Sequence, residues 1–152
     1  MVDVTEMIGN YNNSKNTMKL YKKIYFVQKE IGSLIKNEIN KFQNYQYFNE
    51  YQVLTKLRPL LDKYDLLILT SDENSSLEYQ KEEKGYVIKY LKKIQIICSE
   101  TSDKMEVFFW AVGSNADLAK AKGSAETYAM KYFLSKFFLM PVTDSLDPDY
   151  SK

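Results

Sequence analysis

The side chains that could do chemistry are few in this 152-residue sequence, and their pattern excludes several kinds of enzyme. There is no histidine, which removes His-based zinc sites and the Ser-His-Asp and Cys-His nucleophile systems. Cys98 is the single cysteine, so an intrachain disulfide and a CxxC motif are impossible. Its place in the apolar segment IQIICSE predicts a small buried hydrophobic residue. We expect no catalytic residue among these groups.

Nucleotide and metal chemistry also lack their usual sequence signals. No GxxxxGK[ST] phosphate-binding loop occurs, and the five glycines are scattered along the chain. The carboxylates Asp144, Asp147 and Asp149 alternate with other residues after Pro141. A metal nuclease would need carboxylates clustered on rigid elements, so we interpret this segment as a solvated tail. We predict no metal site, no cofactor and no enzymatic activity.

Charge restricts any nucleic-acid contact to a local patch, because 21 basic residues face 20 acidic ones and the net charge is only +1. Binding of a single strand needs cations for the phosphates and aromatic faces for the bases. Eight basic residues are candidates for these contacts, and for each of them an ordinary solvated charge is the alternative. They are Lys56 and Arg58, Lys89, Lys92 and Lys93, Lys120 and Lys122, and Lys131.

The elements that must position these residues follow from periodicity. An apolar stripe predicts a helix over residues 18–40, and a capping box at Asn49 and Gln52 begins a second helix that runs to about Tyr64, with a kink or restart at Pro59. Residues 66–70 favour a strand, and residues 72–85 are acidic and flexible-looking. Residues 86–99 and 105–112 predict a hairpin with a turn at 100–104.

The last predicted helix is the most informative element. It spans residues 124–140, with Ser124 as its cap and Pro141 at its end. Its apolar residues cover most of its circumference, which leaves a polar stripe of Thr127, Lys131 and Ser135 at i, i+4 and i+8. Such a helix must be covered on several sides, either by a neighbouring subunit or by the two earlier helices. The residues assigned to oligomer interface or core are Tyr128, Tyr132, Phe133 and Phe137.

The order of these elements implies an α+β fold: two N-terminal helices, then a β-β-β-α core with an antiparallel sheet. We predict a flexible N-terminal arm over residues 1–17, a single domain over residues 18–141, and an acidic tail over residues 142–152. The N-terminal residues contain no apolar stretch, and no apolar run approaches the ~18 residues of a membrane span. We therefore expect neither a signal peptide nor a membrane segment, and the single cysteine fits the reducing cytosol.

The segment KAKGSAETYAMKYFLSKFFLMPVTDSLDPD, residues 120–149, resembles the C-terminal signature of the Erf (essential recombination function) family of phage single-strand annealing proteins. The residues that match are Gly123, Ser124, Ala125, Thr127, Tyr128, Ala129, Lys131 and Tyr132. NYQYFNEYQVLTKLRPLLDKYDLLI, residues 44–68, is similar to the paired tyrosines, helix and short strand of the same family. Trp110 and Asp117 also stand where such chains often carry them. The resemblance covers roughly residues 20–149.

The resemblance implies a core similar to that of the ring-forming eukaryotic strand-annealing recombinases, and assembly into homo-oligomeric rings or filaments. It implies ATP-independent binding and annealing of single-stranded DNA in phage-type recombination, in the cytoplasm of a bacterial host. It favours Lys120, Lys122 and Lys131 as phosphate contacts. Further candidate partners are a single-strand-binding protein or another recombination or regulatory protein. The alternative is a non-annealing oligomeric interaction module of the same fold that binds a protein partner.

Overall fold

The computed structural model describes residues 19–42 and 45–144 of the chain. Its elements, in chain order, are α2 (Leu20–Glu30), β1 (Leu34–Lys36), β2 (Glu38–Asn40), β3 (Tyr45–Tyr47), α3 (Glu50–Lys63), β4 (Leu66–Asp72), β5 (Glu78–Glu82), β6 (Gly85–Cys98), β7 (Lys104–Asn115), α4 (Leu118–Phe137) and β8 (Val142–Asp144). The predicted α+β class is confirmed. The predicted arm, residues 1–17, and most of the predicted tail, including Asp147 and Asp149, lie outside the described residues.

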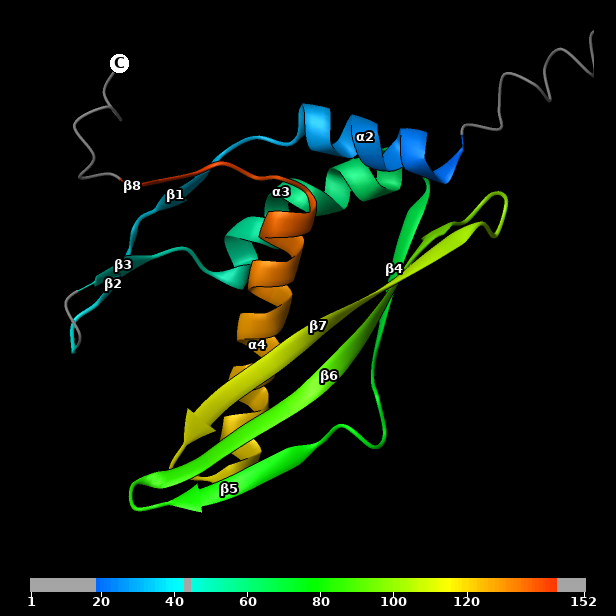
Figure 1. Ribbon diagram of the computed structural model, residues 1–152. Helices are drawn as coiled ribbons and strands as arrows, with labels where there is room; N and C mark the ends of the chain where they lie inside the picture. Colours follow the sequence, from blue (N-terminus) through cyan, green and yellow to red (C-terminus); the bar gives the residue numbers. More distant parts are fainter. Residues whose placement is uncertain (1–18, 43–44, 145–152) are drawn as a thin grey trace, which may run out of the picture.

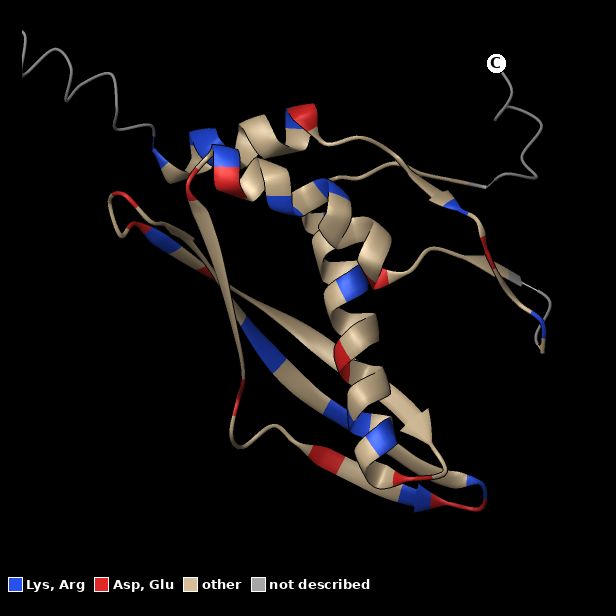
Figure 2. Cartoon of the chain, turned by 180° about the vertical axis from the view of Figure 1, so that it is seen from behind, with Lys and Arg blue, Asp and Glu red and all other residues tan. Residues whose placement is uncertain are grey.

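The central element is an antiparallel sheet built around β6. One edge of β6 pairs with β7 along most of its length, and its other edge pairs with β5 in its first half and with β4 in its second half. Figure 1 shows this sheet in front of α4, and Figure 2, from behind, shows α4 in front of the sheet. Within the described residues, helices therefore cover only one face of the sheet.

Residues of β6 alternate strictly between the two faces of the sheet. The even-numbered residues from Ile88 to Cys98 are buried against the helices, whereas the odd-numbered residues are only partly buried or exposed. The period of two is that of a strand with one covered face. The buried face joins α2, α3 and the second half of α4 in one hydrophobic core. Cys98 lies fully buried in this core, as its apolar neighbours predict.

Two segments differ from the prediction at the N-terminal end. The first helix ends at Glu30 instead of continuing to residue 40, because Ile31 already has extended backbone angles and Gly32 follows it. The residues beyond form β1, which pairs in parallel with β8, and β2, which pairs with β3. The first residues of the predicted tail thus form part of the fold. The capping box at Asn49 and Gln52 is confirmed.

A restart of the helix at Pro59, one of the two predicted outcomes, is wrong, because α3 is continuous from Glu50 to Lys63. Proline removes one backbone donor, and the carbonyl that loses its partner belongs to Thr55, an exposed residue. The acidic segment 72–85, predicted to be flexible, also contains a strand, β5, whose five residues are all exposed and whose sequence therefore shows no apolar alternation. Both misreadings concern residues whose surroundings are mostly solvent.

The start of α4 was placed too late by the sequence pattern. Asp117, not Ser124, is the cap, and its carboxylate accepts a hydrogen bond of 2.9 Å from the Lys120 backbone N–H. Gly123, which precedes the predicted helix, lies inside α4, and a Cβ atom there would meet nothing within 4 Å. Solvent exposure explains why a glycine that costs roughly 1 kcal/mol relative to alanine is tolerated in the helix.

A close approach of two backbones positions α4 on the sheet. A Cβ atom at Gly113 in β7 would lie 2.5 Å from the Ala125 nitrogen and 2.7 Å from the Ala121 oxygen. Ala121 and Ala125 are fully buried, and together with Ala111 and Ala129 they form a second core cluster around Tyr90. Small residues on both elements let the helix axis approach the strand more closely than larger side chains would permit.

This packing makes opposite predictions for two glycines. Gly113→Ala should lower the free energy of unfolding by about 1–3 kcal/mol or more, because the new methyl group meets backbone atoms that cannot turn away. Gly123→Ala, the matched control, should raise it by about 0.5–1 kcal/mol, because it removes a flexible residue from an exposed helix position. Urea unfolding of both variants measures the difference, and a neutral Gly113→Ala would contradict the close approach.

Candidate nucleic-acid interface

The eight predicted basic residues do not form one continuous track in the structure. Lys56 and Arg58 are exposed on α3, Lys120 is exposed in the first turn of α4, and Lys89 and Lys93 lie on the uncovered face of the sheet. Figure 2 shows basic and acidic segments interspersed over both ends of the molecule. The cations that lie beside exposed aromatic rings are therefore the stronger candidates for a single-strand contact.

Lys92 and Lys122 belong to an ion network between β6 and α4. The Lys92 ammonium lies 3.2 Å from Asp72 and is hydrogen-bonded to Glu126, and Lys122 lies 2.9 Å from Asp72 and 3.1 Å from Glu126. The Tyr90 hydroxyl donates to Glu126 as well, and Lys122 sits 4.0 Å from the centre of the Tyr90 ring. Five side chains from three elements thus join the sheet to the helix.

The surroundings shift the pKa values of three members of this network, Glu126, Tyr90 and Lys122, in the directions that favour these contacts. Burial acts to raise the pKa of Glu126, but hydrogen bonds from Lys92, Tyr90 and Lys122 outweigh it and hold the pKa at about 2. Burial and the hydrogen bond to Glu126 raise the pKa of Tyr90 to about 12. Burial acts to lower the pKa of Lys122, yet the bonds to Asp72, Tyr90 and Glu126 raise it overall. At neutral pH Glu126 and Lys122 therefore carry their charges and Tyr90 keeps its proton.

The network corrects the prediction for Lys92, whose residue is only 1% exposed and cannot present its charge on the surface. Its position in the alternation of β6 explains this, because even-numbered residues of this strand face the helix. Lys122 is partly exposed but already engages two carboxylates. Asp72 lies far from both lysines along the chain, and Glu126 lies far from Lys92, so no spacing rule connects them. Lys122 and Glu126 form an i,i+4 pair, which the predicted helix start at Ser124 concealed.

Lys131 also differs from its prediction. The residue is 5% exposed and Ser135 is also buried, so of the polar stripe of Thr127, Lys131 and Ser135 only Thr127 is exposed to solvent. Four aromatic rings surround the ammonium group, with ring centres at 4.5–5.6 Å, in a range that permits cation–π attraction. The rings belong to Tyr47, Phe48, Tyr128 and Tyr132.

The aromatic residues assigned to interface or core divide between two environments. Phe133 is buried in the main core and Phe137 packs against it, whereas Tyr128 and Tyr132 are stacked on each other and partly exposed. The apolar circumference of α4 is thus covered largely within the chain, by the sheet, α2 and α3. Of the two predicted alternatives, cover by a neighbouring subunit or by the chain itself, Phe133 and Phe137 show the second.

The uncovered face of the sheet combines cations with exposed aromatic rings. Phe108 and Trp110 of β7 are each 53% exposed, and the Lys89 ammonium lies 5.2 Å from the centre of the Trp110 ring. Lys93 pairs directly opposite Phe108 in the ladder, and Leu91 lies opposite Trp110. We call this set, Lys89, Leu91, Lys93, Phe108 and Trp110, the sheet platform. Sequence reasoning assigned its lysines but gave its rings no binding role, although Phe108 and Trp110 at i and i+2 on one strand must share a face.

The lysines of the sheet platform have carboxylate neighbours that water can screen. Lys89 lies 3.4 Å from Glu78, and Lys93 lies 3.2 Å from Glu106. Exposed ion pairs of this kind contribute about 0–1 kcal/mol, so a phosphate can take the place of a carboxylate at small cost. The aromatic faces need no rearrangement to receive a base.

A second exposed aromatic and basic cluster lies on α2. Lys19, Tyr21, Lys22 and Tyr25 line a shallow hollow of about 400 Å³, and Lys22 lies 5.2 Å from the centre of the Tyr25 ring. These residues lie off the apolar stripe of the helix. The spacing of Tyr21 and Tyr25 at i and i+4 is the sequence signal that could have indicated this exposed aromatic cluster. This α2 cluster is smaller than the sheet platform and shares no residue with the Erf signature.

The family model described as ERF superfamily matches residues 20–152 of the chain. The protein therefore belongs to the ERF superfamily, as the resemblance of residues 120–149 predicted. Membership supports a general role in phage single-strand annealing. A search of the curated proteins finds no match to this chain.

Two further observations concern the described part of the chain. It contains no helix long and apolar enough to cross a membrane. It also contains no group of three or more His, Cys, Asp and Glu residues arranged to hold a metal ion.

The ion network predicts a specific loss of stability in acid. Because the pKa of Glu126 is held at about 2 in the folded state, below its ordinary value of 4.5, its contribution is present above pH ~4.5 and is lost as the pH falls toward 2. Glu126→Gln should lower the free energy of unfolding at pH 7 by about 1–2 kcal/mol, an amount reduced by partial solvent exposure. It should also flatten the pH dependence between about 4.5 and 2.

Glu78→Gln is the matched control for this prediction, because Glu78 pairs with one lysine on the exposed sheet face. It should change stability by less than about 0.5 kcal/mol. Urea titrations of both variants and the parent protein across pH 2–7 measure the two effects. Equal losses in the two variants would show that the ion network contributes no more than a surface pair.

Proposed function

We propose that this protein binds single-stranded DNA and anneals complementary strands without ATP, as a homo-oligomer in the cytoplasm of a bacterial host. The observation that carries the proposal is the match of residues 20–152 to the ERF superfamily, because that family performs single-strand annealing. The sequence lacks a phosphate-binding loop, in agreement with annealing driven by binding alone.

We further propose that the sheet platform is a contact surface for the single strand. Its two rings provide π-faces for bases, and Lys89 and Lys93 provide charge for phosphates on the same side of the sheet. Among the other predicted contacts, Lys56, Arg58 and Lys120 are exposed and remain candidates for phosphate binding. Lys92, Lys122 and Lys131 would then act mainly by holding α4 and its neighbours in place.

The annealing proposal predicts a reaction that needs neither nucleotide nor divalent metal. Complementary oligonucleotides without internal structure should anneal faster with the protein than without it, in EDTA and in the absence of ATP. Fluorescence quenching between end-labelled strands measures the rate. Acceleration that appears only when ATP is added would contradict the proposal. An oligomer of full size that neither binds nor anneals DNA would instead support the non-annealing interaction module.

The sheet platform predicts distinct effects for its aromatic and basic members. Trp110→Ala should weaken single-strand binding by about 1–3 kcal/mol, because a stacking face is lost. Lys89→Gln should lower the slope of log affinity against log salt by about 0.7, because one fewer counterion is released, and it should do so similarly for all sequences. Fluorescence anisotropy with a labelled oligonucleotide across a salt series measures both effects.

Two controls make this test selective. Lys84→Gln removes an exposed lysine from the β5–β6 turn and should leave the salt slope unchanged. Tyr21→Ala removes an exposed ring from the α2 cluster, and a loss of affinity there but not in Trp110→Ala would move the binding surface to α2. Oligomer size is measured for each variant, because loss of both size and affinity would place the changed residue at a subunit contact.

A further inference from the structure

The sheet has two long open edges that most soluble proteins would protect. β4 and β7 each pair only with β6 among the described strands. The N–H and C=O groups on the outer edge of each therefore form no hydrogen bond with another described strand. Natural edge strands are usually shortened, bulged, or marked by lysine or proline to prevent pairing with another chain. From Leu66 to Ser71, β4 contains no charged residue and no proline, and from Val107 to Asn115 the same is true of β7.

The hydrogen bonds at the strand ends show which backbone groups point outward. The Ser99 N–H donates to the Asp65 carbonyl and the Glu73 N–H donates to the Leu91 carbonyl, both at 2.9 Å. Because bonded and non-bonded pairs alternate in an antiparallel ladder, the even-numbered residues of β4, such as Thr70, direct their N–H and C=O groups to the open edge. The bond from the Cys98 N–H to the Asp103 carbonyl, at 2.8 Å, similarly turns the even-numbered residues of β7 outward.

Exposed apolar side chains flank both edges on the uncovered face. Leu67 and Leu69 of β4 and Phe108, Trp110 and Val112 of β7 are all more than 40% exposed. Cross-strand partners share a face, so these residues lie on one side of the sheet. If the edge of β4 met the edge of β7 of a second molecule, the leucines would lie side by side with the aromatic residues, and the flank that each group turns toward the other would be covered.

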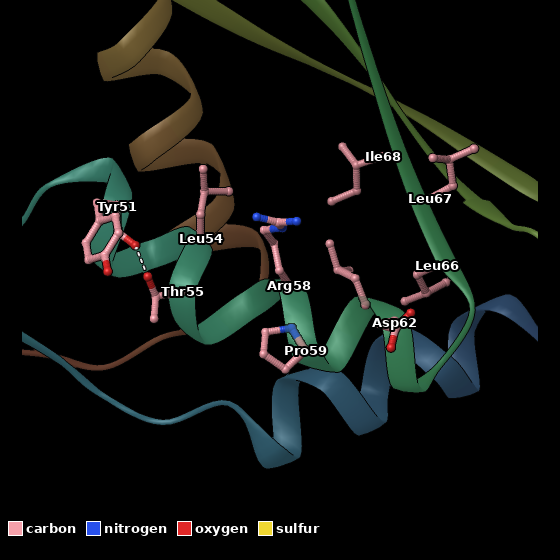
Figure 3. A pocket seen from close by; sticks show the side chains of 10 residues that line it. Tyr51, Leu54, Thr55, Arg58, Pro59, Asp62, Leu66, Leu67 and Ile68 are labelled. Atoms are coloured by element: carbon pink, nitrogen blue, oxygen red, sulfur yellow. Dashed lines mark hydrogen bonds between the residues drawn. The ribbon is translucent and has the colours of Figure 1, made fainter.

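The other side of the β4 edge is open as well. A groove of about 910 Å³ runs between α3 and β4, and its lining includes Leu54, Leu66 and Ile68 (Figure 3). Met105 and Val107 of β7 face the same side of the sheet as Leu66 and Ile68. An added β7 strand in parallel would direct these two side chains toward the groove.

Strand direction and charge favour pairing of unlike edges. β4 and β7 both run antiparallel to β6 and therefore run parallel to each other, so a repeated arrangement of molecules pairs β4 of one with β7 of the next in parallel. In the register that sets Phe108 beside Leu69, the basic Lys104 at the start of β7 lies beside Asp65, which directly precedes β4. Pairing of two β4 edges would be antiparallel and would bring Asp65 near Asp72 and Glu73, which repel it.

We infer that a second copy of this chain adds its β7 edge to the β4 edge, which forms one continuous sheet across subunits. The contact is heterologous, because the two surfaces differ, and its repetition builds a ring or a filament. It also aligns the sheet platforms of successive subunits on one side of the assembly. The inference concerns how subunits join and holds whether or not the sheet platform binds DNA.

Cysteine crosslinking tests this contact directly. Within one molecule Leu69 and Phe108 are on strands separated by β6, and two strand spacings amount to about 10 Å, beyond the reach of a disulfide. The variant carrying both Leu69→Cys and Phe108→Cys, and a second carrying both Leu69→Cys and Trp110→Cys for the neighbouring register, are oxidised with copper–phenanthroline. We expect a ladder of dimers, trimers and larger species in denaturing gels from at least one of them.

The single variants and the parent protein are the controls, because a heterologous contact needs both cysteines and Cys98 is fully buried. Each should remain a monomer in the gel. A covalent dimer from Leu69→Cys alone would show that two β4 edges meet, and absence of a ladder from both double variants would show that β4 and β7 do not meet. Either result overturns the inference.

A proline substitution tests the same contact without crosslinking. Thr70→Pro removes an N–H that points to the open edge and leaves the bonds to β6 intact, whereas Thr70→Val keeps the N–H. Sedimentation equilibrium should show Thr70→Pro reduced to a species near 17.9 kDa and Thr70→Val unchanged from the parent. Circular dichroism checks that both variants are folded. If Thr70→Pro does not fold, the crosslinking experiment decides the inference alone.

A folded Thr70→Pro variant with the parent's size would overturn the inference, as would a parent protein that is itself a monomer. The annealing assay remains a separate readout, since it uses the unmodified protein. Annealing by an assembly that shows no ladder would leave the proposed function in place and remove only this contact. A ladder without annealing would support this contact and contradict the proposed annealing function.

Discussion

The contact on which the rest of the structure depends is the close approach of α4 to β7 at Gly113. Backbone atoms of Ala121 and Ala125 occupy the space that a side chain at Gly113 would need. This approach sets the height of the helix above the sheet, and that height brings Glu126 within hydrogen-bond reach of Tyr90 and Lys92. The ion network is satisfied because the alanines allow the helix to approach.

The same packing explains why the lysines of α4 have environments that a helical wheel does not predict. A lysine on α4 can reach the sheet, a cluster of rings or solvent, according to which turn it occupies. Lys122 reaches carboxylates, Lys131 is surrounded by aromatic rings, and Lys120 remains in solvent. Several basic residues of the family signature therefore stabilise the position of the helix, and the exposed cations that remain lie mostly on other elements.

Sequence reasoning recovered the features that depend on local pattern. The α+β class, the long hairpin, the capping box at Asn49 and the buried Cys98 all follow from periodicity or from neighbouring residues. It failed where the deciding partner is distant or where one residue overrides a pattern. The apolar stripe predicted a helix past Gly32, whereas the chain forms strands there. Gly123 inside α4 hid the true beginning of that helix at Asp117. The burial of Lys92 and Lys131 depends on partners that no spacing rule connects.

The short parallel pairing of β1 with β8 has a consequence for the order in which the protein can fold. The Gln28 side chain donates to the Phe137 carbonyl and the Thr143 hydroxyl donates to the Leu34 carbonyl, and both contacts join residues 109 positions apart. Contacts between such distant positions close late and slow the folding of a chain. During synthesis, which proceeds from the N-terminus, Leu34 has no strand partner in β8 until Val142 has left the ribosome. The sheet hairpin, whose contacts are local, can form first, and α2 and β1 would complete the core only after β8 has emerged.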